Sequence, residues 1–188
     1  MSKKFSVLVT LLLVGCSTSS IPLLGGGSPF NSTPDYTSLN EEATRSFAQR
    51  VERAVVDGNR DFVLEDTDDL VVNTPAIAQA VKIRAARNEL VSKFMDTGFV
   101  YERRGGLVSI ITNGDYKRST VRLERDRNAL LVMGENNNRR ALYEGLLEAN
   151  NFPRKALPAI RAIFFETRVA LLRAGQQYED STGKLVSK

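Results

Sequence analysis

Residues 73–98, NTPAIAQAVKIRAARNELVSKFMDTG, contain a helix start, a helical repeat of apolar side chains and a helix stop. Thr74 suits the N-cap position, and Pro75 suits the first helical position because its missing N–H is not needed there. The apolar repeat continues to Gly98, a residue type that favours the left-handed backbone found just after helices. We therefore predict a helix that starts at Pro75 and ends at Gly98.

Two arginines interrupt the apolar side of this predicted helix. Arg84 and Arg87 fall inside the apolar arc when residues are placed at about 100° per position. The apolar members of that arc are Ile77, Ala80, Val81, Ile83, Leu90, Val91, Phe94 and Met95. Because a buried arginine is costly without a partner, we expect an acidic partner elsewhere in the chain.

A second long helix is predicted over residues 122–149, because an Asn-Asn pair and Pro153 end its pattern. Three polar residues, Glu135, Asn136 and Arg139, fall on the apolar side of this helix. The apolar members of that side are Leu131, Val132, Leu142, Tyr143, Leu146 and Leu147. The two long helices thus share the same anomaly, and we expect their polar residues to meet.

The expected contact pairs Glu135 with Arg84 or Arg87. In one interpretation it is a structural ion pair that fixes helix register, or the arginines extend their charged heads outward. In the alternative, the polar residues of both helices form a pocket for an anionic group such as a phosphate or a peptide carboxylate. These residues are Arg84, Arg87, Glu135, Asn136 and Arg139.

Short strands are predicted on both sides of the second long helix. Residues 99–102 and 107–111 flank a glycine-containing turn and are typical of a β-hairpin. The Asn-Gly pair at 113–114 predicts a further turn. Near the end of the chain, residues 177–179 and 184–186 flank another glycine turn and predict a second small hairpin.

The last helix, predicted over residues 158–174, has two apolar faces. The second of these consists of Phe165, Val169 and Leu172, and the first is formed by Ile160, Ile163, Phe164, Ala170 and Leu171. A surface helix usually needs only one apolar stripe. Either this helix buries both faces in the core, or its second face is an exposed patch that receives a partner.

A further helix is predicted near the start of the domain, over residues 39–57, with a capping box in Ser38-Leu39-Asn40-Glu41 and a stop at Gly58. An acidic patch follows it, formed by Glu65, Asp66, Asp68 and Asp69. Calcium loops use such carboxylates, but their glycine and distal glutamate are missing, so we expect a solvated loop. Together these elements predict a single domain over residues 38–188. Its expected fold is α+β, predominantly helical, with about four helices and one or two short β-hairpins.

The first residues have the features of a bacterial lipoprotein signal. Lys3 and Lys4 precede an apolar run that ends in Leu13-Val14-Gly15-Cys16. The run is shorter than the roughly 20 residues that cross a bilayer. We predict removal of residues 1–15 and acylation of Cys16, with palmitate among the chains, which anchors the protein. Ser17 favours the outer membrane, facing the periplasm, and residues 16–37 are expected to form a flexible tether.

The composition excludes the commonest catalytic and metal sites. The chain has no histidine, and predicted acylation uses its single cysteine. Triads built on histidine and zinc thiolates are therefore excluded, and we expect no cofactor and no metal. Cleavage lowers the formal charge from +4 to +2 by removing two lysines, and so weak a balance predicts no nucleic-acid binding. We expect a non-enzyme, with an unrecognised hydrolase as the remaining alternative.

Several segments occur in a recognisable order over about residues 70–188. They are Asn73-Thr74-Pro75-Ala76-Ile77, Gly98 with Glu102, Gly105-Gly106-Leu107, Glu135-Asn136, Arg139-Arg140-Ala141-Leu142-Tyr143, Asn150, and a Gly175…Tyr178…Gly183-Lys184-Leu185-Val186 ending. In this order they resemble the bacterial periplasmic YdbL-like family, a domain of unknown function. The resemblance implies an envelope protein of mixed helices and short strands with an assembly or chaperone-like role. It supplies no catalytic residues.

Two functions remain open from the sequence. The first is a lipid-anchored, non-catalytic module that binds another envelope protein and assists its assembly. The second is a periplasmic protein that binds a small ligand or lipid near Arg84 and Arg87. That second function needs a cavity of a few hundred cubic ångströms, whereas a closed and filled core would favour the first.

Overall fold

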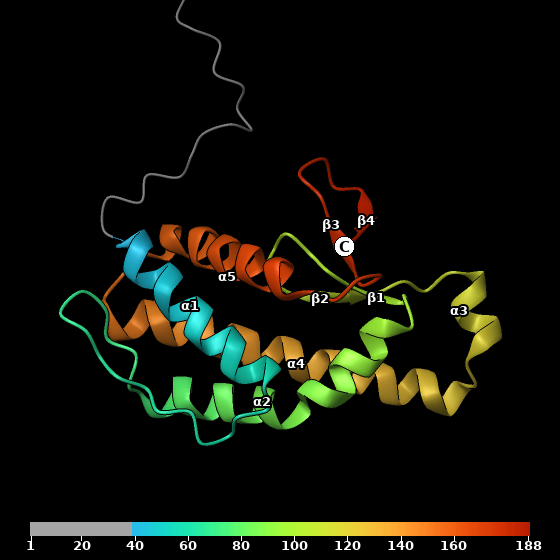
Figure 1. Ribbon diagram of the computed structural model, residues 1–188, viewed down its shortest axis with the longest axis horizontal. Coiled ribbons are helices and arrows are strands. Elements are labelled where there is room, and N and C mark those ends of the chain that lie inside the picture. The colour runs from blue at the N-terminus through green and yellow to red at the C-terminus, as the bar shows by residue number, and fades with distance from the viewer. Residues whose placement is uncertain (1–38) are drawn as a thin grey trace, which may run out of the picture. The chain divides into compact units, whose positions relative to one another are not determined.

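Two long helices, α2 (Pro75–Asp96) and α4 (Arg122–Ala149), pack against each other in this computed structural model, which describes residues 39–188 (Figure 1). Gly145 of α4 lies against Ile77 near the start of α2, where an added Cβ would come within 2.9 Å of Ile77 Cγ1. Gly134 of α4 lies against Arg87 in the second half of α2. The two contacts show that the helices run in opposite directions and approach closely at two glycines.

Two more helices complete the main core. Helix α1 (Glu41–Val56) packs against α5 (Leu157–Leu171) and α2, and α5 also contacts α4. A short 3-10 turn, η1 (Arg154–Ala156), leads into α5. Aromatic rings join the helices, since Phe164 lies 6.3 Å from Phe47 and 5.3 Å from Tyr143 between ring centroids. The buried apolar core includes Phe47, Val51, Ile77, Val81, Leu142, Leu146, Ile160 and Phe164.

One small sheet joins the two predicted hairpins. Its strands are β1 (Val100–Glu102), β2 (Val108–Ile110), β3 (Gln177–Glu179) and β4 (Leu185–Ser187), in the order β2-β1-β3-β4. Each hairpin is antiparallel, and β1 and β3 pair in parallel with Tyr101 opposite Gln177. The sheet thus connects the middle of the chain to its C-terminal end.

A second apolar cluster connects α2 to the sheet and to α3 (Gly114–Ser119). Tyr116 of α3 is buried and lies 5.3 Å from Phe99 between ring centroids. The other buried members are Val91, Phe94, Met95, Val100 and Val108. This cluster places β1 against the C-terminal half of α2.

The structure confirms an α+β fold that is predominantly helical. Helix α4 has the predicted bounds, and α2 begins after Thr74, whose side chain accepts a hydrogen bond from the Ile77 amide. Gly98 has a φ of +74°, as its place after α2 requires. Both predicted hairpins form.

Four local predictions were wrong. Asn113 starts α3 instead of a turn, because its Oδ1 accepts a hydrogen bond from the Tyr116 amide at 2.9 Å. Helix α5 ends at Leu171, before the predicted residue 174, since Leu172 takes an extended backbone. Helix α1 begins at Glu41, after the predicted residue 39, because Asn40 is its N-cap and its Oδ1 accepts a hydrogen bond from the Ala43 amide. Leu90, expected on the inner arc of α2, is exposed.

The predicted signal at residues 1–15, Cys16 and the tether at residues 16–37 lie outside the described residues, as does Ser38. The described residues belong to one compact unit. Within residues 39–188, no helix combines the length and the apolar character needed to cross a bilayer.

Candidate functional site

Six charged side chains meet in the centre of the domain and form a closed ring of ion pairs. They come from five different elements of the fold. The members are Glu52 of α1, Arg84 of α2, Glu102 of β1, Glu135 and Arg139 of α4, and Arg168 of α5. Acidic and basic residues alternate around this ring, so each arginine lies between two glutamates.

The first half of the ring is built on Arg84. Its two terminal nitrogens donate to both carboxylate oxygens of Glu52 at 2.9 and 2.8 Å, and its Nε donates to Glu135 Oε1 at 2.9 Å. The same Glu135 Oε1 accepts from Arg139 Nε at 2.6 Å. One carboxylate oxygen therefore joins α2 to α4.

The second half closes the ring through Glu102. Arg139 donates to both of its carboxylate oxygens at 2.7 and 2.8 Å. Arg168 donates from Nε to Glu102 Oε2 at 3.0 Å and from Nη1 to Glu52 Oε1 at 3.1 Å. Its remaining terminal nitrogen donates to the Gly106 carbonyl, which also accepts from the Tyr143 hydroxyl.

The ring is buried and electrically neutral. Each of its side chains is at most 6% exposed, and three positive charges face three negative ones. Moving such charges out of water is expensive, and their attraction offsets the cost only when geometry is good and the hydrogen bonds are satisfied. The two-pronged contacts of Arg84 and Arg139 supply that geometry.

The ring keeps its carboxylates ionised. Burial alone would raise the pKa of Glu102, but the charges and hydrogen bonds of Arg139 and Arg168 lower that pKa to about 2. Burial would likewise raise the pKa of Glu135, and Arg84 and Arg139 lower it to about 2. The pKa of Glu52 is lowered in the same way, against its burial, mainly by Arg84.

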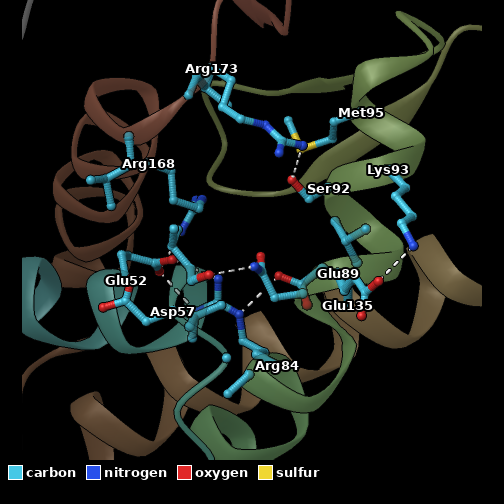
Figure 2. Close-up of a pocket in the computed structure, with 18 of the residues that line it drawn as sticks. Glu52, Asp57, Arg84, Glu89, Ser92, Lys93, Met95, Glu135, Arg168 and Arg173 are labelled. Carbon is cyan, nitrogen blue, oxygen red and sulfur yellow. Dashed lines mark hydrogen bonds and ion pairs between the residues drawn. The ribbon is translucent and has the colours of Figure 1, made fainter.

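A pocket of about 660 Å³ lies over one side of the ring, between the C-terminal ends of α1 and α5 and the C-terminal half of α2 (Figure 2). Six acidic and six basic residues line it. Arg173 reaches across the outer part and donates to Ser92 at 2.6 Å and to Asp96. Lys93 pairs with Glu89 at 2.6 Å on the same side. The pocket is therefore polar and carries no net formal charge.

The predicted contact between α2 and α4 is present and involves Arg84, not Arg87. Arg84 and Glu135 form an ion pair, and Arg139 belongs to the same ring. Arg87 is exposed and lies outside the ring. Its side chain lies over Gly134 of α4, where any residue with a Cβ would collide with it.

Asn136 also lies outside the ring. Its amide donates to the carbonyl of Val108 and accepts from the Val108 amide, both at 2.9 Å. These two bonds satisfy the backbone groups of Val108 on the outer edge of β2, where no strand pairs with it in the sheet.

Three members of the ring were not predicted as site residues, although the spacing of the residues around each one indicates a buried position. Glu52 lies one helical turn after the buried Ala48 of α1, and Arg168 lies one turn after the buried Phe164 of α5. Glu102 lies two positions after the buried Val100, which puts both side chains on one face of β1. Each is a polar residue at a position whose period predicts burial.

The predicted partner face of α5 is only partly accessible. Phe165, Val169 and Leu172 are all half-buried, and Leu172 packs against the second apolar cluster. The large apolar side chains that are exposed lie on other elements, with Leu90 on α2 and Leu123, Leu130 and Met133 on α4 as a group.

The acidic patch folds as an exposed loop. Asp66 accepts hydrogen bonds from the Val72 and Asn73 amides at 2.6 and 2.7 Å, and these bonds lower the pKa of its carboxyl. Thr67 and Leu70 form a single antiparallel bridge. In the described part of the chain, no group of three or more histidine, cysteine or acidic side chains is arranged to hold a metal ion.

Comparisons with protein-family models, with curated proteins and with solved structures find no match to this chain.

Proposed function

We propose that this protein is a lipid-anchored, non-catalytic cell-envelope protein, held at the outer membrane by acylated Cys16 and facing the periplasm. Its domain serves as a rigid module that binds another envelope protein and assists its assembly. The sequence of residues 1–16 supports the proposed location. The ordered resemblance to the YdbL-like family supports the proposed assembly role.

The ring is the observation that carries the non-catalytic part of this proposal. A general acid or base works best with a pKa near the operating pH. The arginines hold the pKa of Glu102 and of Glu135 at about 2, far from neutral. Every charge in the ring is also engaged by a partner, so the ring acts as a support for the surrounding helices.

Capture of partners from the native membrane tests this function. The full-length protein is crosslinked in its own membranes and purified, and its mature N-terminus and captured proteins are read by mass spectrometry. We expect an acylated Cys16 and one reproducible envelope protein, which is lost with Phe165→Asp on the half-buried face of α5. The variant must melt like the parent protein for that loss to count.

Two results would contradict the proposal. An unmodified Cys16 in the mature protein would remove the lipid anchor. A folded parent protein that captures no partner, or a well-folded Phe165→Asp variant that captures as much as the parent, would remove the interaction role from this face.

A polar small-ligand binder is the second candidate, and the pocket over the ring favours it. Its volume of about 660 Å³ lies within the usual range for ligand sites. The three arginines of the ring are already neutralised by glutamates, so a ligand with both charges suits this pocket better than a simple anion.

Arg173→Ala separates this candidate from the first. Arg173 lines the pocket but lies outside the ring, and its side chain is 58% exposed. If the pocket binds a small polar molecule, that molecule copurifies with the parent and is lost in Arg173→Ala, with little change in melting temperature. Arg45→Ala is the matched control, because Arg45 forms an exposed ion pair with Glu166 away from the pocket. Equal small-molecule content in all three proteins would argue against a ligand site.

A further inference from the structure

An apolar strip lies exposed on the N-terminal half of α4. Leu123, Leu130 and Met133 are 59%, 62% and 54% exposed. Leu123 and Leu130 are two helical turns apart and Met133 lies one turn further, so the three share the outer face of the helix. Val121, just before α4, is equally exposed. We call Leu123, Leu130 and Met133 the α4 strip.

Helix α2 extends this apolar surface through Leu90. A Cβ on Gly134 would come within 2.5 Å of Arg87 Nη1, so Arg87 lies across α4 at that level. Because α2 and α4 are antiparallel, the position one turn after Arg87 in α2 is level with the position one turn before Gly134 in α4. That geometry puts the exposed Leu90 level with Leu130 along the helix pair.

Basic side chains surround the α4 strip. Residues 113–133 contain five basic and three acidic residues, and Arg87 adds a further positive charge from α2. Two of the acids are next to arginines, since Asp115 pairs with Arg118 and Asp126 lies 4.0 Å from Arg122. The exposed Lys117 and Arg127 form no ion pair with any residue of the described range 39–188.

The acidic part of the domain lies at the other end. Figure 1 shows the loop between α1 and α2, which holds Glu65, Asp66, Asp68 and Asp69, at the end of α4 opposite to α3. This loop is tied there because Asn150, just after α4, hydrogen-bonds both the amide and the carbonyl of Val71. The 28 residues of α4 separate the two ends by about 42 Å.

We propose that the α3–α4 end of the domain docks on an anionic lipid surface. The exposed leucines and Met133 enter the boundary between headgroups and acyl chains, and Lys117, Arg87 and Arg127 meet lipid phosphates. Apolar and basic side chains side by side on a helix are the combination that lies in a membrane interface. The acidic loop at the opposite end is repelled by the same surface and so orients the domain.

This docking does not depend on the lipid anchor, although it is compatible with one. The 23 peptide links from Cys16 to Leu39 span at most about 80 Å when fully extended. That length exceeds the length of α4, so an anchored chain can present either end of the domain to its membrane.

A fluorescent label on the α4 strip tests the proposal. The chain has one cysteine, so the full chain with Cys16→Ser and Leu130→Cys carries a single thiol for an environment-sensitive dye. We expect a blue shift of its emission with vesicles of phosphatidylethanolamine and phosphatidylglycerol, and none with phosphatidylcholine vesicles. The same dye at Glu144→Cys, on the exposed side of the C-terminal half of α4, should show no shift.

A charge variant supplies a second readout in the same background. Arg127→Ala should weaken binding to the anionic vesicles about fivefold, the factor that one basic side chain contributes near such a surface. Arg50→Ala, an exposed arginine on α1, should leave binding unchanged.

Three results would overturn lipid docking. One is no shift at position 130 with anionic vesicles. Another is an equal shift with phosphatidylcholine. The third is a shift without lipid that grows with protein concentration, which would make the strip an interface between two copies of the chain. None of these results depends on acylation of Cys16 or on a protein partner.

Discussion

Arg84→Ala lowers the free energy of unfolding by about 3–5 kcal/mol, the usual cost of removing one partner from a buried ion pair. The change leaves Glu52 without its two-pronged donor and Glu135 without one of its two arginines. Three glutamates then face two arginines in a site that water scarcely reaches. Urea unfolding followed by circular dichroism measures the loss.

Arg87→Ala is the matched control on the same helix. Arg87 lies three residues further along α2, is exposed and has no place in the ring. Its removal should change the free energy of unfolding by no more than about 0.5 kcal/mol. If both variants unfold at the same urea concentration as the parent, the ring contributes no stability of the kind described.

Lysine at position 84 does not restore the ring. An ammonium group is a compact charge, whereas the arginine plane donates to Glu52 and Glu135 in different directions at once. We therefore expect Arg84→Lys to unfold at a clearly lower urea concentration than the parent.

Acid unfolds this domain through the same ring. The pKa of Glu102 and that of Glu135 are about 2 in the folded protein, against an ordinary value of 4.5. Between those two pH values the unfolded chain binds more protons than the folded one, so acid favours unfolding. The stability contributed by these carboxylates is complete above pH 4.5 and is lost as the pH falls toward 2.

Urea midpoints measured from neutral pH down to pH 2 test this expectation. Glu102→Gln should be less stable at neutral pH and should lose less stability than the parent on acidification, because one of the titrating groups is gone. Glu144→Gln, on the exposed side of α4, should follow the parent. A Glu102→Gln curve parallel to that of the parent would show that the ring does not cause the acid sensitivity.

Local signals predicted most of the helices, because helix ends depend on nearby residues. Thr74, Pro75 and Gly98 set the ends of α2 without help from the rest of the fold. The parallel pairing of β1 with β3 could not be predicted, since it joins Tyr101 to Gln177, which are far apart in the sequence. No local sequence pattern indicates that a strand of one hairpin will pair with a strand of the other.

The ring could be predicted only in part. Arg84 and Glu135 interrupt the apolar faces of two long helices, and such helices have to pack face to face. Arg87 and Leu90 were misplaced because the apolar arc of α2 is wider than its buried surface. Gly134 leaves room for Arg87 at the edge of α4, which puts that side chain outside the core, and Leu90 is likewise exposed.

The ring also has a consequence for the order of folding. Its contacts join residues 32, 51, 37, 66 and 116 positions apart, and they close only when α1, α2, β1, α4 and α5 have all assembled. A partly assembled chain leaves a charge in the interior without its counter-charge, so such intermediates are disfavoured. Interactions that form after the folding transition state act on the unfolding rate and leave the folding rate almost unchanged. We therefore expect the ring to form late in folding and to lower the unfolding rate of the completed domain.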